Sequence, residues 1–563
     1  MLICKASSAQ GCSPSTTLNQ NFMQKGILEC RQALKLRSLS SMRSPSFKRR
    51  SGMSTQTYLI DTNVIIHLED NKTVEPAFSA LTSLAAKHKV DIFVHEAARD
   101  DVGRDKDTAR REISLSKLGK FQTLSKVRGL TTADLSNAFG PLPKHNDIVD
   151  ATLLHALHIG AVDFLVSQDR GLHERARRHS PELGRRVLYV ADAVQLLRTT
   201  YEPIEAPVRF IDEVAAHAIP LTDTIFDSLR EDYPGFDKWW TEKCVKQRRL
   251  CWIIEDDGIA GLLVRKDETG SDTDAMEKAN KILKICTFKV RPERRGLKLG
   301  ELLLKKVFWF AQKNKYDLVY VTTYEGQTSL IDLLEYFGFT HTATKEDDER
   351  IYEKRMGTRA PTPTDGDNRF DVHRLNYPRF AIVPDTAAFG IPIKEGYHDI
   401  LYPDLKQQNQ LDLFGALGLG GGPRRPGNTI RKVYLCRAPS NLGPPGSLLF
   451  FYKGKSSSSP SQAMSAIGIL EDVRYARSTR ELLQMTGGRS VYSEQDLEGW
   501  RASAESPVKV INYLLAAYID PAIGLKQLQE SKIITEHPPQ SIFRIPRPRL
   551  DDLLSQIDLG FQA

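Results

Sequence analysis

Four carboxylates in the first third of the chain have the spacing of a metal-binding cluster. They are Asp61, Glu96, Asp150 and Asp169. Three of them follow apolar runs with the pattern of buried strands, at 58–60, 90–94 and 164–167, and the other lies in a helical stretch. Because the carboxyl ends of parallel strands meet at one edge of a sheet, we expect these acids to lie together.

Like charges held so close need a counter-charge, and a hard cation with oxygen ligands supplies it. The sequence therefore predicts that the four acids bind Mg²⁺ or Mn²⁺. Such an ion activates a water molecule and stabilises the charge of a phosphodiester displacement, so the predicted chemistry is that of a nuclease.

The segments around these acids also resemble a known family. LIDTNVIIHL, DATLLHAL and FLVSQD are similar to the signature segments of PIN-domain nucleases, over residues 58–201. The resemblance implies a Rossmann-like parallel sheet that cleaves RNA, with the four acids as its catalytic, metal-binding quartet. Asn63 matches the polar residue that follows the first acid, and Ser167 matches the hydroxyl before the last one. Asp147 is a further candidate, and Asp100 and Asp101 are alternatives to Glu96.

A second segment, RPERRGLKLG at 291–300, has the residues typical of an anion-binding turn. It joins a predicted strand, 281–290, to a predicted helix, 301–314. Free backbone N–H groups and the helix dipole favour a negatively charged ligand at such a junction. The residues predicted to form this anion site are Val290, Arg295, Gly296, Lys298, Leu299 and Gly300.

This turn and the later segment LLEYFGF resemble GNAT N-acetyltransferases over residues 210–354. The resemblance implies acetyl-CoA held between splayed strands and direct acyl transfer to an amine. Two positions depart from the family pattern. Lys298 stands where the family usually has glycine, and the usual tyrosine position falls on Leu334, two residues before Tyr336. Tyr324, Glu325 or a water molecule is then expected to move the proton.

The last third of the chain has short strand-like runs separated by turns, which predicts a small β-barrel. The order of these runs resembles ASCH or PUA-like domains, which implies binding of RNA or modified bases. Lys394, Arg431 and Lys432 are the candidate RNA contacts.

The fold class predicted from these patterns is a multidomain α/β protein. Its segments are a basic extension at 1–52, a PIN-like domain at 53–203, a GNAT-like domain at 204–357, a linker at 358–378 and an ASCH/PUA-like β-rich domain at 379–563. The extension is either an organelle leader or a disordered or mis-started segment preceding Met53. It holds nine basic residues and one acidic residue, which equals the whole net charge of +8. The basic balance therefore gives no support for a basic nucleic-acid-binding body.

Three functional hypotheses remain open. The first combines an RNA-directed nuclease with an N-acyltransferase, in an RNA-processing or toxin–antitoxin context, with an antitoxin-like protein partner and a homodimer as candidates. The second is a nuclease gated by a GNAT domain that senses acyl-CoA without turnover. The third is a scaffold in which both sites are degenerate. No apolar run is long enough to span a membrane, and the expected location is the cytoplasm.

Overall fold

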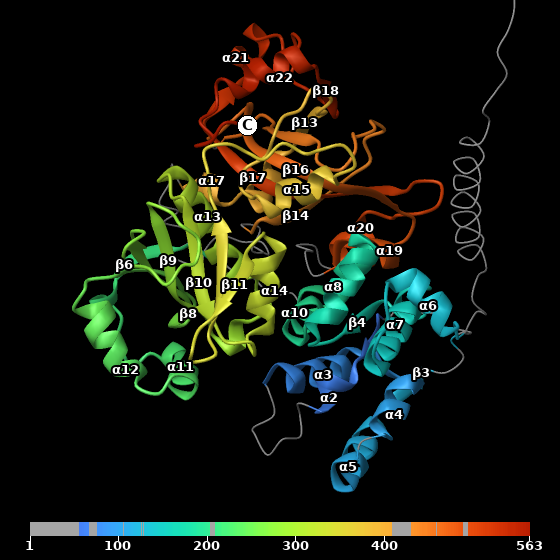
Figure 1. Cartoon of the computed structure of the whole chain (residues 1–563). Helices are drawn as coiled ribbons and strands as arrows, with labels where there is room; N and C mark the ends of the chain where they lie inside the picture. The colour runs from blue at the N-terminus through green and yellow to red at the C-terminus, as the bar shows by residue number, and fades with distance from the viewer. Residues whose placement is uncertain are drawn as a thin grey trace, which may run out of the picture.

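The computed structural model describes residues 56–66, 76–104, 106–124, 127, 129–202, 209–407, 429–457, 459–487 and 494–563 of the 563-residue chain. The predicted extension, 1–52, lies outside the described residues. Three sheets follow one another along the chain, coloured from blue to red in Figure 1. No helix in the described ranges is long and apolar enough to cross a membrane.

The first sheet has five strands, all parallel, in the order β3-β2-β1-β4-β5. Its strands are β1 Thr57–Ile60, β2 Asp91–His95, β3 Gln122–Leu124, β4 Phe164–Val166 and β5 Val187–Leu188. The apolar strands β1 and β4 are fully buried, as expected of parallel strands covered on both faces. Its helices are α2 Thr62–Ile66, α3 Pro76–His88, α4 Glu96–Val102, α5 Thr108–Leu118, α6 Thr132–Phe139, α7 His145–His158, α8 Arg170–His179, α9 Pro181–Arg186 and α10 Val190–Tyr201. The predicted parallel α/β architecture of this part is confirmed.

The second sheet has seven strands in the order β11-β12-β10-β9-β8-β7-β6. They are β6 Asp212–Ala215, β7 Leu250–Glu255, β8 Ile259–Glu268, β9 Ile282–Val290, β10 Leu318–Thr323, β11 Thr340–Thr344 and β12 Arg350–Arg355. Asp257 and Gly258 both adopt positive φ, at 54° and 87°, and close the β7–β8 hairpin, as the Asp-Gly pair predicts. The long helices are α13 Leu299–Lys313 and α14 Thr328–Tyr336, and the short helices α11 Asp227–Asp232 and α12 Phe236–Trp239 lie at the periphery.

The third sheet has six strands of mixed direction, in the order β14-β17-β16-β15-β13-β18. They are β13 Ala388–Ile393, β14 Arg431–Cys436, β15 Leu448–Lys453, β16 Ala463–Ala476, β17 Val508–Gly524 and β18 Phe543–Ile545. Its described helices are α16 Glu395–Leu401, α17 Asp404–Gln407, α19 Thr479–Thr486, α20 Glu494–Gly499, α21 Leu525–Glu530 and α22 Arg547–Leu554. We expected a small barrel here, whereas this strand order runs from edge strand β14 to edge strand β18.

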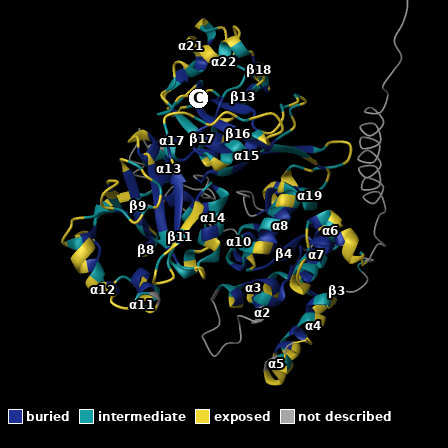
Figure 2. Cartoon of the chain, in the orientation of Figure 1, coloured by how far each residue is buried: buried dark blue, intermediate teal, exposed yellow. Residues whose placement is uncertain are grey.

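Each sheet with its helices forms one unit, and the three units share buried cores. Figure 2 shows the buried residues of each unit in dark blue. One hydrophobic cluster joins α13 and α14 to the third sheet, and another joins the first sheet to α19 and α20. The segment 358–378, interpreted as a linker, holds the helix α15 Arg369–Leu375 and the fully buried Tyr377. The Tyr377 hydroxyl donates to the Leu515 carbonyl at 2.7 Å, so this segment is packed between the second and third sheets.

Candidate functional sites

The turn before α13 has the backbone geometry of an anion-binding loop. Gly296 and Lys298 adopt positive φ, at 83° and 60°, and Lys298 is the N-cap of α13 without a side-chain capping bond. The Arg291 guanidinium donates to the carbonyls of Asp257 and Ile259, at 2.8–3.1 Å, and holds the loop against the β7–β8 turn. The left-handed conformation of Lys298 is one that glycine adopts without steric cost, which fits the glycine that the GNAT resemblance implies at this position.

Four successive N–H groups face out of the start of α13. Among the described residues, the backbone N–H groups of Lys298, Leu299, Gly300 and Glu301 have no hydrogen-bond acceptor. A β-carbon at Gly300 would lie 3.6 Å from both Leu333 and Phe288, an ordinary packing distance. Together with the helix dipole, these groups can receive the oxygens of a phosphate or diphosphate.

Strands β9 and β10 separate on the side of this loop. They pair in parallel from Ile282–Leu318 to Ile285–Val321, and beyond that point no pairing between them is recorded. β9 continues to Val290 and β10 to Thr323, where β10 pairs only with β12. The separation is the splay that the GNAT resemblance implies, and it leads to the N-terminus of α13.

The start of α10, from the first unit, lies directly against the loop. A β-carbon on Gly296 would come within 2.2 Å of the Ala191 carbonyl oxygen, so only glycine fits at this contact. The Lys298 Nζ lies 2.9 Å from Asp192 Oδ1. The lysine that departs from the family pattern is thus half of an ion pair between two units. Sequence reasoning missed Ala191 and Asp192, because no motif marks them.

A cavity of about 1400 Å³ opens where the three units meet. Its lining includes the predicted loop residues Val290, Arg295, Gly296, Lys298, Leu299 and Gly300. The first unit contributes Gln168, Tyr189 and Asp192, and the third contributes Arg431 and Asp472. All six predicted cofactor-binding residues therefore line one space.

The residues considered for proton transfer have different surroundings. Leu334, at the usual tyrosine position, is fully buried in the core, and Tyr336 lines the cavity between the guanidinium groups of Arg374 and Arg431, at 4.6 and 5.1 Å. Tyr324 follows β10 and packs on Tyr233 with ring centroids 5.2 Å apart.

Burial and the nearby acids Glu349 and Asp347 raise the pKa of Tyr324. This keeps its hydroxyl protonated at neutral pH. The side chain of Glu325 is 75% exposed and pairs with Arg350 at 2.7 Å. Tyr324 and Glu325 are not among the residues that line the junction cavity.

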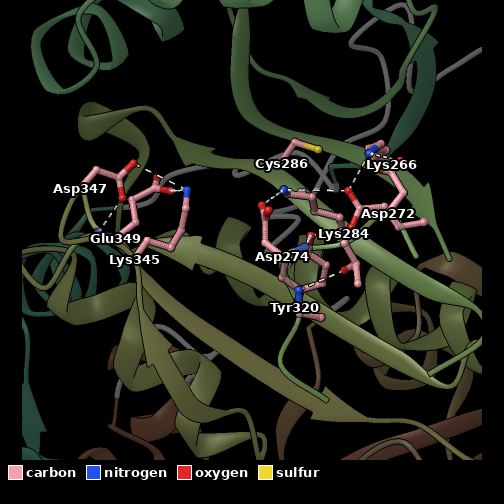
Figure 3. A network of polar contacts seen from close by, with 12 residues as sticks. Lys266, Asp272, Asp274, Lys284, Cys286, Tyr320, Lys345, Asp347 and Glu349 are labelled. Atoms are coloured by element: carbon pink, nitrogen blue, oxygen red, sulfur yellow. Dashed lines mark hydrogen bonds and ion pairs between the residues drawn. The ribbon is translucent and has the colours of Figure 1, made fainter. Parts of the chain in front are cut away.

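Residues on strands β8, β9 and β10, with Asp274 from the segment between β8 and β9, form a charged network where β9 and β10 are still paired (Figure 3). The Tyr320 hydroxyl donates to Glu268 at 2.6 Å, and Lys284 pairs with Asp274 at 2.6 Å. Lys266 also pairs with Glu268, at 2.8 Å. The network surrounds Tyr320 with fixed charges, so this region of the sheet is polar.

Three of the four acids of the predicted quartet interact electrostatically. Ser167 Oγ donates to Asp61 Oδ2 at 2.7 Å and accepts from the Asp169 N–H at 3.0 Å, which ties these two acids together. Asn63 Nδ2 donates to the same oxygen of Asp61 at 2.8 Å. Burial, with the charges of Asp61 and Asp169, raises the pKa of Asp150 to about 8. The predicted roles of Asn63 and Ser167 as polar neighbours of the first and last acids fit this geometry.

Glu96 is exposed at the start of α4, after His95, whose Nδ1 accepts from the Ala97 N–H. Asp147 pairs with Arg175 at 2.8 Å. Within the described ranges, no group of three or more His, Cys, Asp or Glu residues is arranged to hold a metal ion. The four-acid metal centre therefore stays a prediction.

The three candidate RNA contacts differ in exposure. Lys394 is exposed, whereas Lys432 is 3% exposed and donates to the Leu401 carbonyl at 2.6 Å. Arg431 Nε donates to the buried Glu301 at 2.8 Å. Lys432 is buried in this structure and not accessible to RNA, which corrects its assignment as an RNA contact. Arg431 joins two units and stays a candidate.

Comparisons with known proteins agree with this geometry in the middle of the chain. Residues 215–339 match the model of the Acetyltransferase (GNAT) family. No curated protein matches the chain. A GNAT family acetyltransferase from Elizabethkingia anophelis, solved with acetyl-CoA bound, is 16% identical, with 27% of this chain and 100% of that chain covered and a TM-score of 0.21.

Two further solved structures are each similar to part of the chain. PaiA N-acetyltransferase from Thermoplasma acidophilum, in complex with coenzyme A, is 14% identical over 26% of this chain and 99% of that chain, with a TM-score of 0.22. An ASCH protein from Zymomonas mobilis is 17% identical over 30% of this chain and 96% of that chain, with a TM-score of 0.22. Residues 215–339 are a GNAT acetyltransferase domain, set between an N-terminal parallel α/β sheet and a C-terminal mixed sheet.

Proposed function

We propose that this protein transfers an acyl group from acyl-CoA to an amine. The observation that carries the proposal is the row of four unpaired N–H groups, Lys298 to Glu301, at the mouth of the β9–β10 splay. These groups fit the diphosphate of CoA, and the splay fits an extended arm that leads away from it. Bound acyl-CoA would supply the activated acyl group as a thioester.

The residues of the chain would then orient the reactants and move protons. The amine acceptor loses a proton as it forms the amide bond, and the departing thiolate gains one. We assign the second step to the Tyr324 hydroxyl, because it directly follows β10 at the splayed end of the strand and a phenol is protonated at neutral pH. Glu325 is the weaker candidate, because its carboxylate is exposed and already paired with Arg350.

The test is calorimetric titration of acetyl-CoA into the full chain, followed by measurement of free thiol release with RNA and small amines as acceptors. Binding with release of CoA supports the transferase. Binding without release under any acceptor supports the alternative, an acyl-CoA-sensing domain that gates the first unit. Absence of binding would overturn both.

A second function, metal-dependent cleavage of RNA, is proposed for the first unit. The observation that favours it is the charge coupling of Asp61, Asp150 and Asp169 at one edge of a parallel sheet. Carboxylates held this close together fit Mg²⁺ or Mn²⁺ as their counter-charge. Glu96, exposed at the start of α4, is the proposed fourth ligand.

The nuclease is tested with single-stranded RNA and Mn²⁺. Asp61→Asn and Asp150→Asn are expected to abolish cleavage, with Asp91→Asn, an exposed acid at the other end of β2, as the matched control. Cleavage retained by both site variants would refute this assignment. The ASCH-like third unit would then hold the RNA, with Lys394 as the exposed candidate contact.

A further inference from the structure

The first unit covers the loop that the proposed function assigns to acyl-CoA. Helix α10 begins at Val190, and its second and third residues, Ala191 and Asp192, are those that meet the loop. The Ala191 carbonyl oxygen lies against Gly296, on the loop that precedes the four free N–H groups. The covering atoms are therefore an oxygen with partial negative charge and a full carboxylate.

Both groups oppose a phosphate at this position. A backbone carbonyl packed on Gly296 takes the space next to the loop, and the Asp192 carboxylate is negative like the ligand. Asp192 also pairs with the Lys298 ammonium, one of the cations of the loop and the one at the N-cap of α13. Diphosphate and Asp192 would therefore compete for the same cation and the same space.

Two more ion pairs fasten the first unit to the GNAT domain. Arg177 of α8 forms a bidentate salt bridge with Asp332 of α14. Arg170 Nη1, also on α8, lies 3.0 Å from Glu335 Oε1 of α14. Helix α8 contacts α14, and the two helices can be followed in Figure 1. All three pairs are partly exposed, so salt and ligand can reach them.

The same helix reaches the acidic cluster. Asp169 is the N-cap of α8, where its Oδ1 accepts from the Leu172 N–H at 3.0 Å, and Arg170 is the next residue. A displacement of α8 from α14 would therefore move a residue that adjoins Asp169. The ion pairs that join α8 to α14 therefore begin one residue after an acid of the proposed nuclease site.

We propose that the N-terminal unit is an autoinhibitory lid over the acyl-CoA loop of the GNAT domain, with the Asp192–Lys298 ion pair as its latch. Acyl-CoA binds when the start of α10 withdraws, and the docked lid lowers the affinity of the loop. The inference rests on the proposed function, since it takes acyl-CoA as the ligand of this loop. By linkage, acyl-CoA also weakens the docking of the lid.

The first test is the affinity of the full chain for acetyl-CoA, measured by calorimetry. Asp192→Asn keeps the shape and removes the charge, and it is expected to tighten binding about tenfold, a factor typical of coupling between sites. The matched control is Glu202→Gln, which removes an ion pair with Lys87 at the other end of α10, inside the first unit, and is expected to leave the affinity unchanged. Equal affinity of Asp192→Asn and the unaltered chain would overturn the latch.

The second test is hydrogen–deuterium exchange of the unaltered chain with and without acetyl-CoA. Faster exchange in residues 189–195 on ligand binding is the expected result, since the lid leaves the loop. Slower exchange in these residues would contradict the lid proposal and indicate that α10 contacts the bound acetyl-CoA. If neither the unaltered chain nor Asp192→Asn binds acetyl-CoA, the proposed function itself fails; if both bind equally, only the lid fails.

Discussion

Arg431 and Glu301 form a salt bridge that joins the third sheet to helix α13 of the GNAT domain. The Arg431 Nε donates at 2.8 Å and its backbone N–H at 2.7 Å, both to the Glu301 carboxylate, which is 3% exposed. Glu301 is also the third residue of the helix whose N-terminus forms the proposed diphosphate site. The GNAT domain is thus held to its C-terminal neighbour immediately beside its candidate ligand site.

Removing one partner of this bridge is expected to destabilise the protein strongly. Glu301→Ala leaves the Arg431 guanidinium without its carboxylate, which costs about 3–5 kcal/mol for a buried pair. Urea unfolding followed by fluorescence measures the change. Glu242→Gln, which removes an exposed i,i+4 pair with Lys246, is the control and should change stability by less than about 0.5 kcal/mol. Equal small effects would show that the bridge adds little to stability.

Two substitutions at Gly300 separate packing from ligand binding. Gly300→Ala fits, because its β-carbon meets Leu333 and Phe288 at 3.6 Å, and alanine favours the helix by about 0.5–1 kcal/mol. It is expected to bind acetyl-CoA within about twofold of the original chain. Gly300→Glu places a negative side chain beside the diphosphate and should weaken binding at least about 100-fold, the effect of nearly 3 kcal/mol.

Calorimetry of both Gly300 variants, with circular dichroism to confirm folding, is the measurement. Undiminished binding by Gly300→Glu would place the ligand away from this loop.

Substitution of Tyr324 tests the proton donor. If its hydroxyl protonates the departing thiolate, Tyr324→Phe should lower kcat by about 100-fold, in the usual range for a positioned acid, while the dissociation constant of acetyl-CoA stays the same. Glu325→Gln, at the adjacent exposed position, should change kcat by no more than about twofold. Steady-state kinetics from pH 6 to pH 10 measures both. An unchanged kcat for Tyr324→Phe would indicate that a water molecule, and not Tyr324, protonates the thiolate.

Local patterns were sufficient for the strand ends and for one hairpin. The apolar run before Asp61 predicts a buried parallel strand, and the structure places Asp61 after β1 and Asp169 after its neighbour β4. The Asp257-Gly258 pair likewise predicts the β7–β8 turn, because both residues must take positive φ. These features depend on residues close together in the sequence.

Contacts between the three units could not be predicted from such local patterns. Asp192 and Lys298 are 106 residues apart, and Glu301 and Arg431 are 130 apart. A charged side chain gives no periodic signal of its distant partner, so Arg431 looked like a surface cation suited to RNA. The same limit applies to Lys298. Its partner Asp192 lies in another unit, so the sequence alone does not explain why lysine replaces the expected glycine.

The acidic cluster should make stability depend on pH in the absence of metal ions. Burial and the charges of Asp61 and Asp169 raise the pKa of Asp150 to about 8. The folded chain therefore keeps this proton up to about pH 8, whereas the unfolded chain releases it near the ordinary value of 3.8. Because the folded state binds more protons between these values, the stability that this group contributes is lost as pH rises from about 4 to about 8.

Asp150→Asn removes this titration, so its melting temperature should exceed that of the original chain at pH 8.5 and approach it at pH 5. Thermal unfolding in chelator measures the difference. If Asp150 is a metal ligand, Mn²⁺ should raise the melting temperature of the original chain at pH 8.5, by binding the deprotonated carboxylate, and leave Asp150→Asn unaffected. Equal shifts in both proteins would contradict the metal site, and an equal gap at both pH values would contradict the raised pKa.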